Sequence, residues 1–279
     1  MNLENTIKKA SQALKNKKIN SHVLDAEIIL SDIMGVEREF LTTNNKNNIS
    51  KKIKNKYALA IKRRIKNEPV AYIIGKKEFW SQNFTINQKT LIPRPESELI
   101  IYKLVNYYKQ KNISILDIGT GSGCILLSLL KELKQSRGLG IDVSPGAIKI
   151  AQMNSQNLNL NARSKFKVID FKDFNIGKYD LIVSNPPYIA LKDIKNLARD
   201  IIRYEPLVAL RGGFDGLEII RKVIYKSKYL IKKNGLLAIE IGTNQYIKVS
   251  EILKKNGFRE INNECDFNKN VRCIISTYT

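Results

Sequence analysis

The first part of the chain, residues 1–69, has its apolar side chains spaced as in α-helices. One set recurs every three or four positions, at Leu3, Ile7, Ala10 and Leu14. Two similar runs begin at Ser21 and Ser50, and serine commonly caps the first turn of a helix. Gly35 and Pro69 follow these two runs, and both residue types end helices. We therefore predict a small helical domain over residues 1–69.

Residues 70–95 change to a strand-like pattern. Phe84 and Ile86 alternate with polar neighbours, which indicates a β-hairpin rather than a helix. The segment runs into residues 91–96, where two prolines restrict the backbone to an extended turn. We predict a hairpin linker over residues 70–95 and a second domain over residues 96–279.

Strands and helices alternate through this second domain. Short apolar runs predict strands at residues 113–118, 139–142, 166–169, 179–184 and 235–241. Helical patterns separate them, and one helix begins at Ser144 and Pro145, a capping residue followed by proline in the first turn. This alternation is typical of a doubly wound, Rossmann-like α/β fold with a parallel sheet. Two extended runs in residues 257–279 predict an antiparallel pair at the edge of that sheet.

A glycine-rich turn after the first of these strands is the first candidate binding site. It consists of Gly119, Thr120, Gly121, Ser122 and Gly123. Glycines let the backbone turn tightly there and bring its N–H groups against a ligand. The next strand ends about twenty residues later in Asp142, whose carboxylate can accept hydrogen bonds from a ribose. We predict that these six residues bind a nucleoside cofactor.

Two departures from the dinucleotide-binding fingerprint favour S-adenosyl-L-methionine as that cofactor. Cys124 occupies the position of the third glycine of the fingerprint. Asp117 begins the turn, close to where a pyrophosphate would lie. A carboxylate repels phosphate, but it attracts the ammonium group of a methionine moiety.

Asp170 and Phe171, which follow the third strand, allow two interpretations. The carboxylate and the aromatic ring can bind the amino group of adenine and stack on its ring. Equally, they can be an acidic residue at the end of a strand and an aromatic residue of the core. The residues alone leave both interpretations open, and we include the pair among the predicted cofactor-binding residues.

The fourth strand is followed by Asn185, Pro186, Pro187 and Tyr188, the predicted catalytic motif. Ligands of an open parallel sheet bind beyond the carboxyl ends of its strands, so this loop should face the cofactor, with Asn185 in contact with it. A planar amino or amide nitrogen is a poor nucleophile. The Asn185 oxygen and the Pro186 carbonyl can hold its two N–H groups and orient it for in-line displacement. The prolines keep the loop extended, and Tyr188 can pack on the planar group.

Composition and charge change this picture little. The net charge of +22 is compatible with nucleic-acid binding. However, Lys, Asn and Ile recur throughout both halves of the chain, which indicates the base composition of the gene rather than a local phosphate-binding patch. No apolar run approaches the roughly 20 residues of a membrane span. The three cysteines lack the spacing of a metal site. We expect a cytoplasmic protein without a metal and without membrane contact.

The chain closely resembles the bacterial peptide-chain release factor N5-glutamine methyltransferases, the PrmC/HemK family. Besides the two motifs, the resemblance is carried by residues 68–72, 78–80, 91–96, 204–207 and 240–242. It covers essentially the whole chain. The segments before the glycine turn are the discriminating ones, because amino-methyltransferases in general share only the turn and the Asn-Pro-Pro-Tyr motif.

The resemblance implies a function for each motif. In the family, the glycine turn and the acid of the second strand bind S-adenosylmethionine, and an aromatic residue, here Phe171, stacks on adenine. The Asn-Pro-Pro-Tyr motif, here residues 185–188, holds the glutamine of a Gly-Gly-Gln (GGQ) tripeptide in release factors. The implied reaction is methylation of the N5 nitrogen of that glutamine. The GGQ-containing domain is then the partner, the helical domain recognises it, and direct nucleic-acid binding is not required.

Two other functions remain as alternatives. An amino-methyltransferase acting on adenine or guanine in DNA or RNA would use the same catalytic motif, after flipping a base into the pocket. A non-catalytic RNA-binding protein on a methyltransferase scaffold would need neither intact motif, so their presence disfavours it.

Overall fold

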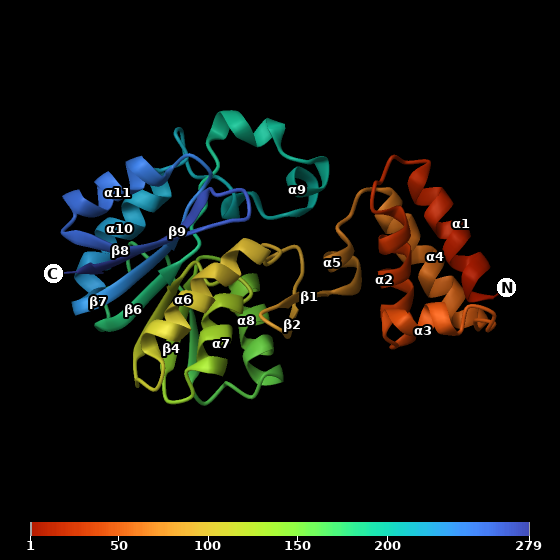
Figure 1. Cartoon of the computed structure of the whole chain (residues 1–279), viewed down its shortest axis with the longest axis horizontal. Helices are drawn as coiled ribbons and strands as arrows, with labels where there is room; N and C mark the ends of the chain where they lie inside the picture. Colours follow the sequence, from red (N-terminus) through yellow and green to blue (C-terminus); the bar gives the residue numbers. More distant parts are fainter. Residues whose placement is uncertain (1, 279) are drawn as a thin grey trace. The chain divides into compact units, whose positions relative to one another are not determined.

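The structure is a computed structural model that describes residues 2–278 (Figure 1). Its internal contacts divide the chain into two compact units. The first comprises Met1–Lys76 and Ala198–Tyr204, and the second comprises Lys77–Leu197 and Glu205–Thr279. No helix among the described residues combines the length and apolar character that crossing a membrane requires.

The first unit is helical. Its helices are α1 (Leu3–Lys15), α2 (His22–Met34), α3 (Arg38–Thr43), α4 (Lys51–Ile65), α5 (Val70–Ile74) and α9 (Arg199–Tyr204). The predicted caps are partly confirmed: the Ser50 hydroxyl accepts a hydrogen bond from the Ile53 N–H, whereas the Ser21 side chain makes no cap bond. Gly35 ends α2 in the left-handed conformation, with φ of 68°. The apolar pattern did not reveal α3 and α5, which are only 6 and 5 residues long.

Helix α9 belongs to the first unit although it is far from it in sequence. The Tyr204 hydroxyl at its end donates a hydrogen bond to the Lys66 carbonyl at 3.0 Å. The chain therefore leaves the second unit after Leu197 and returns to it at Glu205.

The predicted hairpin is present but shorter than residues 70–95. It consists of β1 (Lys76–Phe79) and β2 (Gln82–Thr85), joined by Trp80 and Ser81 with φ of 51° and 52°. Positive φ at both central residues is the turn geometry that matches the twist of paired strands. The part before the hairpin forms α5 instead, because Pro69 begins a new helical turn there rather than only ending the previous helix.

The second unit is built on one seven-stranded sheet. Its strands are β3 (Ser114–Ile118), β4 (Arg137–Asp142), β5 (Ser164–Val168), β6 (Tyr179–Ser184), β7 (Ile231–Glu240), β8 (Phe258–Cys265) and β9 (Val271–Tyr278). They lie in the order β5-β4-β3-β6-β7-β9-β8. The first five are parallel, and β9 is antiparallel to both of its neighbours. This topology confirms the predicted Rossmann-like sheet with an antiparallel pair at one edge.

Helices cover both faces of this sheet (Figure 1). One face carries α6 (Glu98–Tyr108), α7 (Cys124–Glu132) and α8 (Pro145–Asn157), and the other carries α10 (Glu218–Leu230) and α11 (Tyr246–Lys255). Successive strand residues alternate between two cores: Ile115 packs in the first and Leu116 in the second. Burial on both faces explains why the strands are continuous apolar runs in the sequence.

Asn154 of α8 fastens the hairpin to the glycine turn. Its side-chain oxygen accepts a hydrogen bond from the Thr85 N–H at 2.7 Å. Its side-chain nitrogen donates to the carbonyls of Thr85 and Ser122, both at 2.9 Å. Asn154 itself is only 1% exposed.

Asp117 fixes the start of the glycine turn from inside the protein. It is 1% exposed, and its carboxylate accepts a hydrogen bond from the Thr120 hydroxyl at 2.7 Å. Burial raises the pKa of the Asp117 carboxyl from 3.8 to about 7, although the Thr120 hydrogen bond opposes the shift. The backbone N–H groups of Gly119 and Thr120 both donate to the Ile141 carbonyl, so the turn is held on β4 as well.

Replacing Asn154 with alanine should destabilise the second unit. The Asn154→Ala variant leaves the half-buried backbone groups of Thr85 and the buried Ser122 carbonyl without partners, so we expect the free energy of unfolding to fall by about 2–4 kcal/mol. Chemical denaturation measures this quantity. Asn157→Ala, an exposed site on the same helix, is the matched control and should change it by less than about 0.5 kcal/mol. Equal effects of the two variants would contradict the fastening role.

Asp117 should make stability depend on pH. Between pH of about 4 and 7 the folded protein holds a proton on Asp117 that the unfolded chain has lost, so the stability from this group falls as pH rises. Asp117→Asn retains an acceptor for Thr120 and removes the buried charge. Its unfolding free energy, relative to the unsubstituted protein, should therefore increase by about 1–3 kcal/mol from pH 5 to pH 8. A constant difference would show that Asp117 is ionised throughout.

Candidate active site

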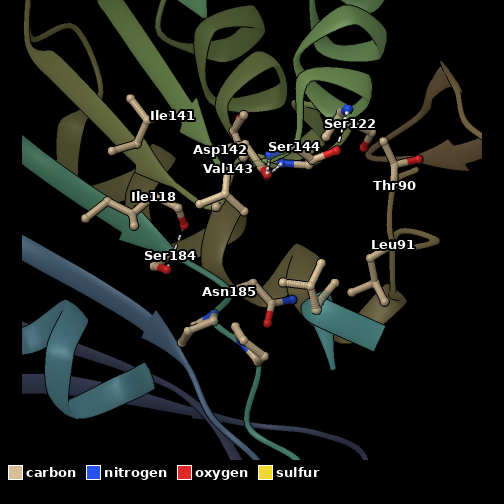
Figure 2. A pocket seen from close by; sticks show the side chains of 18 of the residues that line it. Thr90, Leu91, Ile118, Ser122, Ile141, Asp142, Val143, Ser144, Ser184 and Asn185 are labelled. Atoms are coloured by element: carbon tan, nitrogen blue, oxygen red, sulfur yellow. Dashed lines mark hydrogen bonds between the residues drawn. The ribbon is translucent and has the colours of Figure 1, made fainter. Parts of the chain in front are cut away.

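A cavity of about 300 Å³ lies at the carboxyl ends of β3, β4 and β6 (Figure 2). Its lining includes ten of the residues that the sequence predicted: Gly119, Thr120, Gly121, Ser122, Asp142, Asp170, Phe171, Asn185, Pro186 and Pro187. Gly123 and Tyr188 do not belong to the lining. The cavity size lies at the lower end of the range usual for small-molecule sites.

The strand order explains why the two motifs meet. From β3 the chain continues to β4 and β5 on one side, and then crosses to β6 and β7 on the other. The sheet therefore reverses its order between β3 and β6, the place where ligands of such folds bind. Ile118 pairs with Ser184 in the ladder, and the Ser184 hydroxyl donates to the Ile118 carbonyl at 2.8 Å. The glycine turn and Asn185 consequently emerge side by side.

Asp142 is held at the end of β4 by two backbone groups. Its two oxygens accept hydrogen bonds from the Gly121 N–H at 3.0 Å and the Ser144 N–H at 2.9 Å. Burial raises the pKa of the Asp142 carboxyl, and these two bonds oppose the shift. A carboxylate has about four acceptor positions, so each oxygen retains capacity for a ligand hydroxyl.

Gly123 has a structural role. It is the N-terminal cap of α7, with φ of 79°. A Cβ atom there would lie 3.1 Å from the Leu127 side chain and 3.2 Å from that of Ala151. Glycine therefore allows α7 to begin directly beneath the cavity.

Asp170 and Phe171 line the cavity after β5. Asp170 accepts a hydrogen bond from the Lys172 N–H at 3.0 Å, and its other oxygen lies 3.3 Å from the Lys172 ammonium. Phe171 is half-buried and packs against the core of the second sheet face. The two interpretations of this pair are thus compatible, because Phe171 contacts both the core and the cavity.

Asn185 reaches the cavity from the end of β6, and Asp142 from the end of β4 (Figure 2). The side-chain nitrogen of Asn185 donates to the Ser97 hydroxyl at 3.2 Å. No residue among 2–278 donates a hydrogen bond to its side-chain oxygen. The asparagine therefore presents an acceptor that is not used within the protein.

Tyr188 is turned away from the cavity. Its hydroxyl donates to Glu240 at 3.3 Å and accepts from the Arg272 guanidinium at 3.0 Å. Burial, followed by the neighbouring Glu240 charge, raises the pKa of Tyr188 to about 12. The Gln245 side chain donates to the Tyr188 carbonyl at 3.0 Å, so the backbone of the loop is fixed on this side too.

Asp117 differs from its sequence interpretation. It was expected near the methionine moiety of the cofactor, but it does not belong to the lining of the cavity. The reason is geometric: strand side chains alternate between faces, and the Asp117 carboxylate turns inward to Thr120.

The sequence analysis assigned no site role to one wall of the cavity. Its residues come from two segments: Leu91, Pro93, Arg94 and Ser97 from one, and Pro206, Val208 and Ala209 from the other. Buried Glu205 joins them, since it lies 2.6 Å from the Arg94 guanidinium and accepts the Ile92 N–H at 3.2 Å. The only signal in the sequence was the resemblance, which includes residues 91–96 and 204–207.

Comparisons with known proteins agree with this site. The family described as "Methyltransferase domain" matches residues 109–276, and the "PrmC N-terminal domain" matches residues 5–75. A release factor glutamine methyltransferase of Clostridium acetobutylicum is 36% identical over 99% of this chain and 98% of its own length. One of Buchnera aphidicola subsp. Schizaphis graminum is 39% identical over 98% of each chain.

Among solved structures, the hMettl16 catalytic domain, determined with MAT2A 3'UTR hairpin 6, has a TM-score of 0.59 and 18% identity. The match covers 83% of this chain and 84% of that one, and it shows a shared fold. The comparisons confirm the predicted family resemblance, the fold class and an S-adenosylmethionine-dependent methyltransferase. The chain belongs to the release factor glutamine methyltransferase family.

Proposed function

We propose that this chain transfers a methyl group from S-adenosylmethionine to the side-chain N5 nitrogen of the glutamine in the GGQ motif of peptide-chain release factors. The observation that carries the proposal is the unused acceptor oxygen of Asn185 in the cavity, in a chain of this family. A primary amide nitrogen has two N–H groups and no readily available lone pair. It needs hydrogen-bond acceptors in a fixed position, which Asn185 and Pro186 offer.

The cavity residues fit the cofactor. When bound, S-adenosylmethionine supplies a methyl group on a positively charged sulfur. In the proposal, the spare acceptor positions of Asp142 bind the ribose hydroxyls, and the glycine turn offers backbone N–H groups beside them. The half-buried Phe171 ring lies at the cavity wall, where it can stack on adenine.

The acceptor amide is the part that Asn185 and Pro186 would hold. One N–H of the substrate donates to the Asn185 oxygen and the other to the Pro186 carbonyl. This arrangement aims the nitrogen lone pair along the line of displacement. Pro187 contributes no N–H that would compete for these acceptors. Pro93 and Val208 form part of the cavity wall beside this group.

The domain assignment belongs to the same proposal. The helical domain, residues 1–69, recognises the folded release factor, and residues 70–95 link it to the methyltransferase domain, residues 96–279. The partner surface is the GGQ-containing domain, and the reaction takes place in the cytoplasm, where release factors act. Methylation of adenine or guanine is disfavoured, because the curated relatives over nearly the full length carry the release-factor name.

Labelling experiments test this function. With radiolabelled S-adenosylmethionine, we expect the label in a release factor, and mass spectrometry should find one added methyl group on the GGQ glutamine. A factor with glutamate in place of that glutamine should remain unlabelled, because a carboxylate lacks both N–H groups. A short GGQ peptide should react more slowly than the whole factor.

DNA and RNA are the controls. Raising the salt concentration should weaken the reaction with the release factor only a few-fold. A nucleic-acid enzyme with six to ten phosphate contacts would lose about 10³–10⁵ in affinity between 50 and 200 mM salt. Efficient labelling of DNA or RNA, with none in the release factor, would overturn the proposal.

Two substitutions should separate cofactor binding from transfer. Asp142→Ala removes acceptors of charge-assisted hydrogen bonds, which contribute about 1.5–3 kcal/mol each, so the dissociation constant of the cofactor should rise at least about ten-fold. Asn185→Ala should leave that constant within about three-fold but lower the transfer rate by about 100-fold or more. Calorimetry and the labelling assay measure the two effects.

The exposed Asp173→Ala is the matched control and should change neither quantity. Unchanged affinity in Asp142→Ala would remove Asp142 from the cofactor site. Near-normal turnover of Asn185→Ala would refute its role as the acceptor grip.

A further inference from the structure

Two buried polar side chains stand directly behind Asn185. Ser97 is 2% exposed and Glu240 is 1% exposed. The Ser97 hydroxyl donates to a Glu240 carboxylate oxygen at 2.5 Å and accepts from the Asn185 side-chain nitrogen at 3.2 Å. Three side chains that are distant in sequence thus form one chain of hydrogen bonds ending at the cavity.

The Ser97 side chain takes part in this series of hydrogen bonds rather than in capping helix α6. It is the N-terminal cap residue of α6, where a serine side chain usually accepts a hydrogen bond from the first turn. In this structure Ser97 makes no such cap bond. Its hydroxyl bonds instead to Glu240, the last residue of β7, next to β6 in the sheet.

Glu240 determines which atoms donate and which accept in this series of hydrogen bonds. An ionised carboxylate only accepts hydrogen bonds, so the single hydroxyl hydrogen of Ser97 is committed to it. The Ser97 oxygen can then only accept. The atom of Asn185 that faces Ser97 must therefore be its nitrogen, and the oxygen of the amide must point the other way.

The groups around Glu240 support its role as a hydrogen-bond acceptor. Its second oxygen accepts a hydrogen bond from the Tyr188 hydroxyl, which accepts one from Arg272, a permanent donor. Burial raises the pKa of Glu240, and the Ser97 hydrogen bond and the Arg272 charge oppose that shift, while the charge of Glu96 adds to it. Ser97, Tyr188 and Arg272 together favour a carboxylate that accepts from both sides.

We propose that Ser97 and Glu240 are positioning residues that fix the amide of Asn185 with its oxygen toward the acceptor nitrogen. This inference rests on the proposed function. A free asparagine amide can rotate by half a turn, and it would then present an N–H group to the N–H groups of the substrate. Without the Ser97 hydroxyl, the reversed amide of Asn185 is no longer disfavoured in energy. For part of the time Asn185 then presents its N–H group instead of its oxygen to the substrate.

The test compares Ser97→Ala with Ser97→Thr, which keeps the hydroxyl. Ser97→Ala should lower kcat for a release factor by about ten- to a hundred-fold. KM and the cofactor dissociation constant should stay within about three-fold, because the lost hydroxyl is bonded to Glu240 and Asn185. Ser97→Thr should recover kcat to within about three-fold of the unsubstituted enzyme. Ser128→Ala is the matched control: Ser128 is fully buried in α7, its hydroxyl has no partner among the described residues, and kcat should not change.

Glu240→Gln keeps the volume of the side chain and removes the requirement that both oxygens accept. It should also lower kcat at least ten-fold with unchanged cofactor affinity, because its amide can donate to Ser97 and so reverse Asn185. This variant decides the question if Ser97→Ala folds poorly, which its thermal unfolding would reveal.

The outcomes separate the two proposals. If the unsubstituted enzyme leaves release factors unlabelled, the proposed function fails, whatever the variants do. If it labels them and Ser97→Ala or Glu240→Gln keeps kcat within two-fold, the positioning role is overturned. A parallel loss of kcat and cofactor affinity, or no recovery in Ser97→Thr, would equally overturn it, since the hydroxyl would then support the cavity as a whole.

Discussion

Strands β3 and β6 pair in parallel with Ile118 opposite Ser184, and each is followed immediately by one of the two motifs. This register brings the glycine turn and Asn185 to the same edge of the sheet, from positions more than 60 residues apart in the chain. A shift of one residue would turn the side chains of β6 to the opposite face and direct Asn185 away from the cavity. The buried apolar residues on both faces of these strands resist such a shift. The hydrophobic core of the second unit therefore determines the geometry of the site.

The sequence predicted those parts whose signal is local. Strand–helix alternation, the cap at Ser144, and the ten predicted cavity residues, seven of them in the two motifs, follow from short patterns, and the structure agrees with them on fold and placement. The sequence pattern did not predict helices α3 and α5, because they are too short to show a helical period. The sequence did not predict the interior position of Asp117, because a strand pattern does not show which polar side chain has a hydrogen-bond partner in the core. The wall around Arg94 and Glu205 joins segments 111 residues apart, and no single-sequence pattern connects them.

Three carboxylates at or near the site, Asp142, Asp117 and Glu240, have different roles because their partners differ. Asp142 accepts from two backbone N–H groups and keeps acceptor capacity at the cavity surface. Asp117 has one hydroxyl partner, and burial leaves its pKa near 7, so it serves the turn rather than a ligand. Glu240 accepts from two hydroxyls, one of which is supported by Arg272. Of the three, Glu240 is the one bonded to Ser97. As a carboxylate it only accepts hydrogen bonds, so Ser97 donates to it and accepts from the Asn185 nitrogen.

The Asn-Pro-Pro-Tyr motif by itself accepts any planar nitrogen with two N–H groups, so the choice between an amide and a nucleobase lies elsewhere in the site. Of the segments that go beyond the general motif, residues 91–96 and 204–207 lie on one side of the cavity, where residues 91–97 and 206–209 form a wall held by Glu205. Ser97 belongs to that wall and also to the chain that orients Asn185. In the proposal, the segment that forms this wall of the cavity is therefore also the segment that orients Asn185. In the proposed function, a substitution that reshapes residues 91–96 acts on the acceptor side of the site, whereas Asp142→Ala acts on cofactor binding.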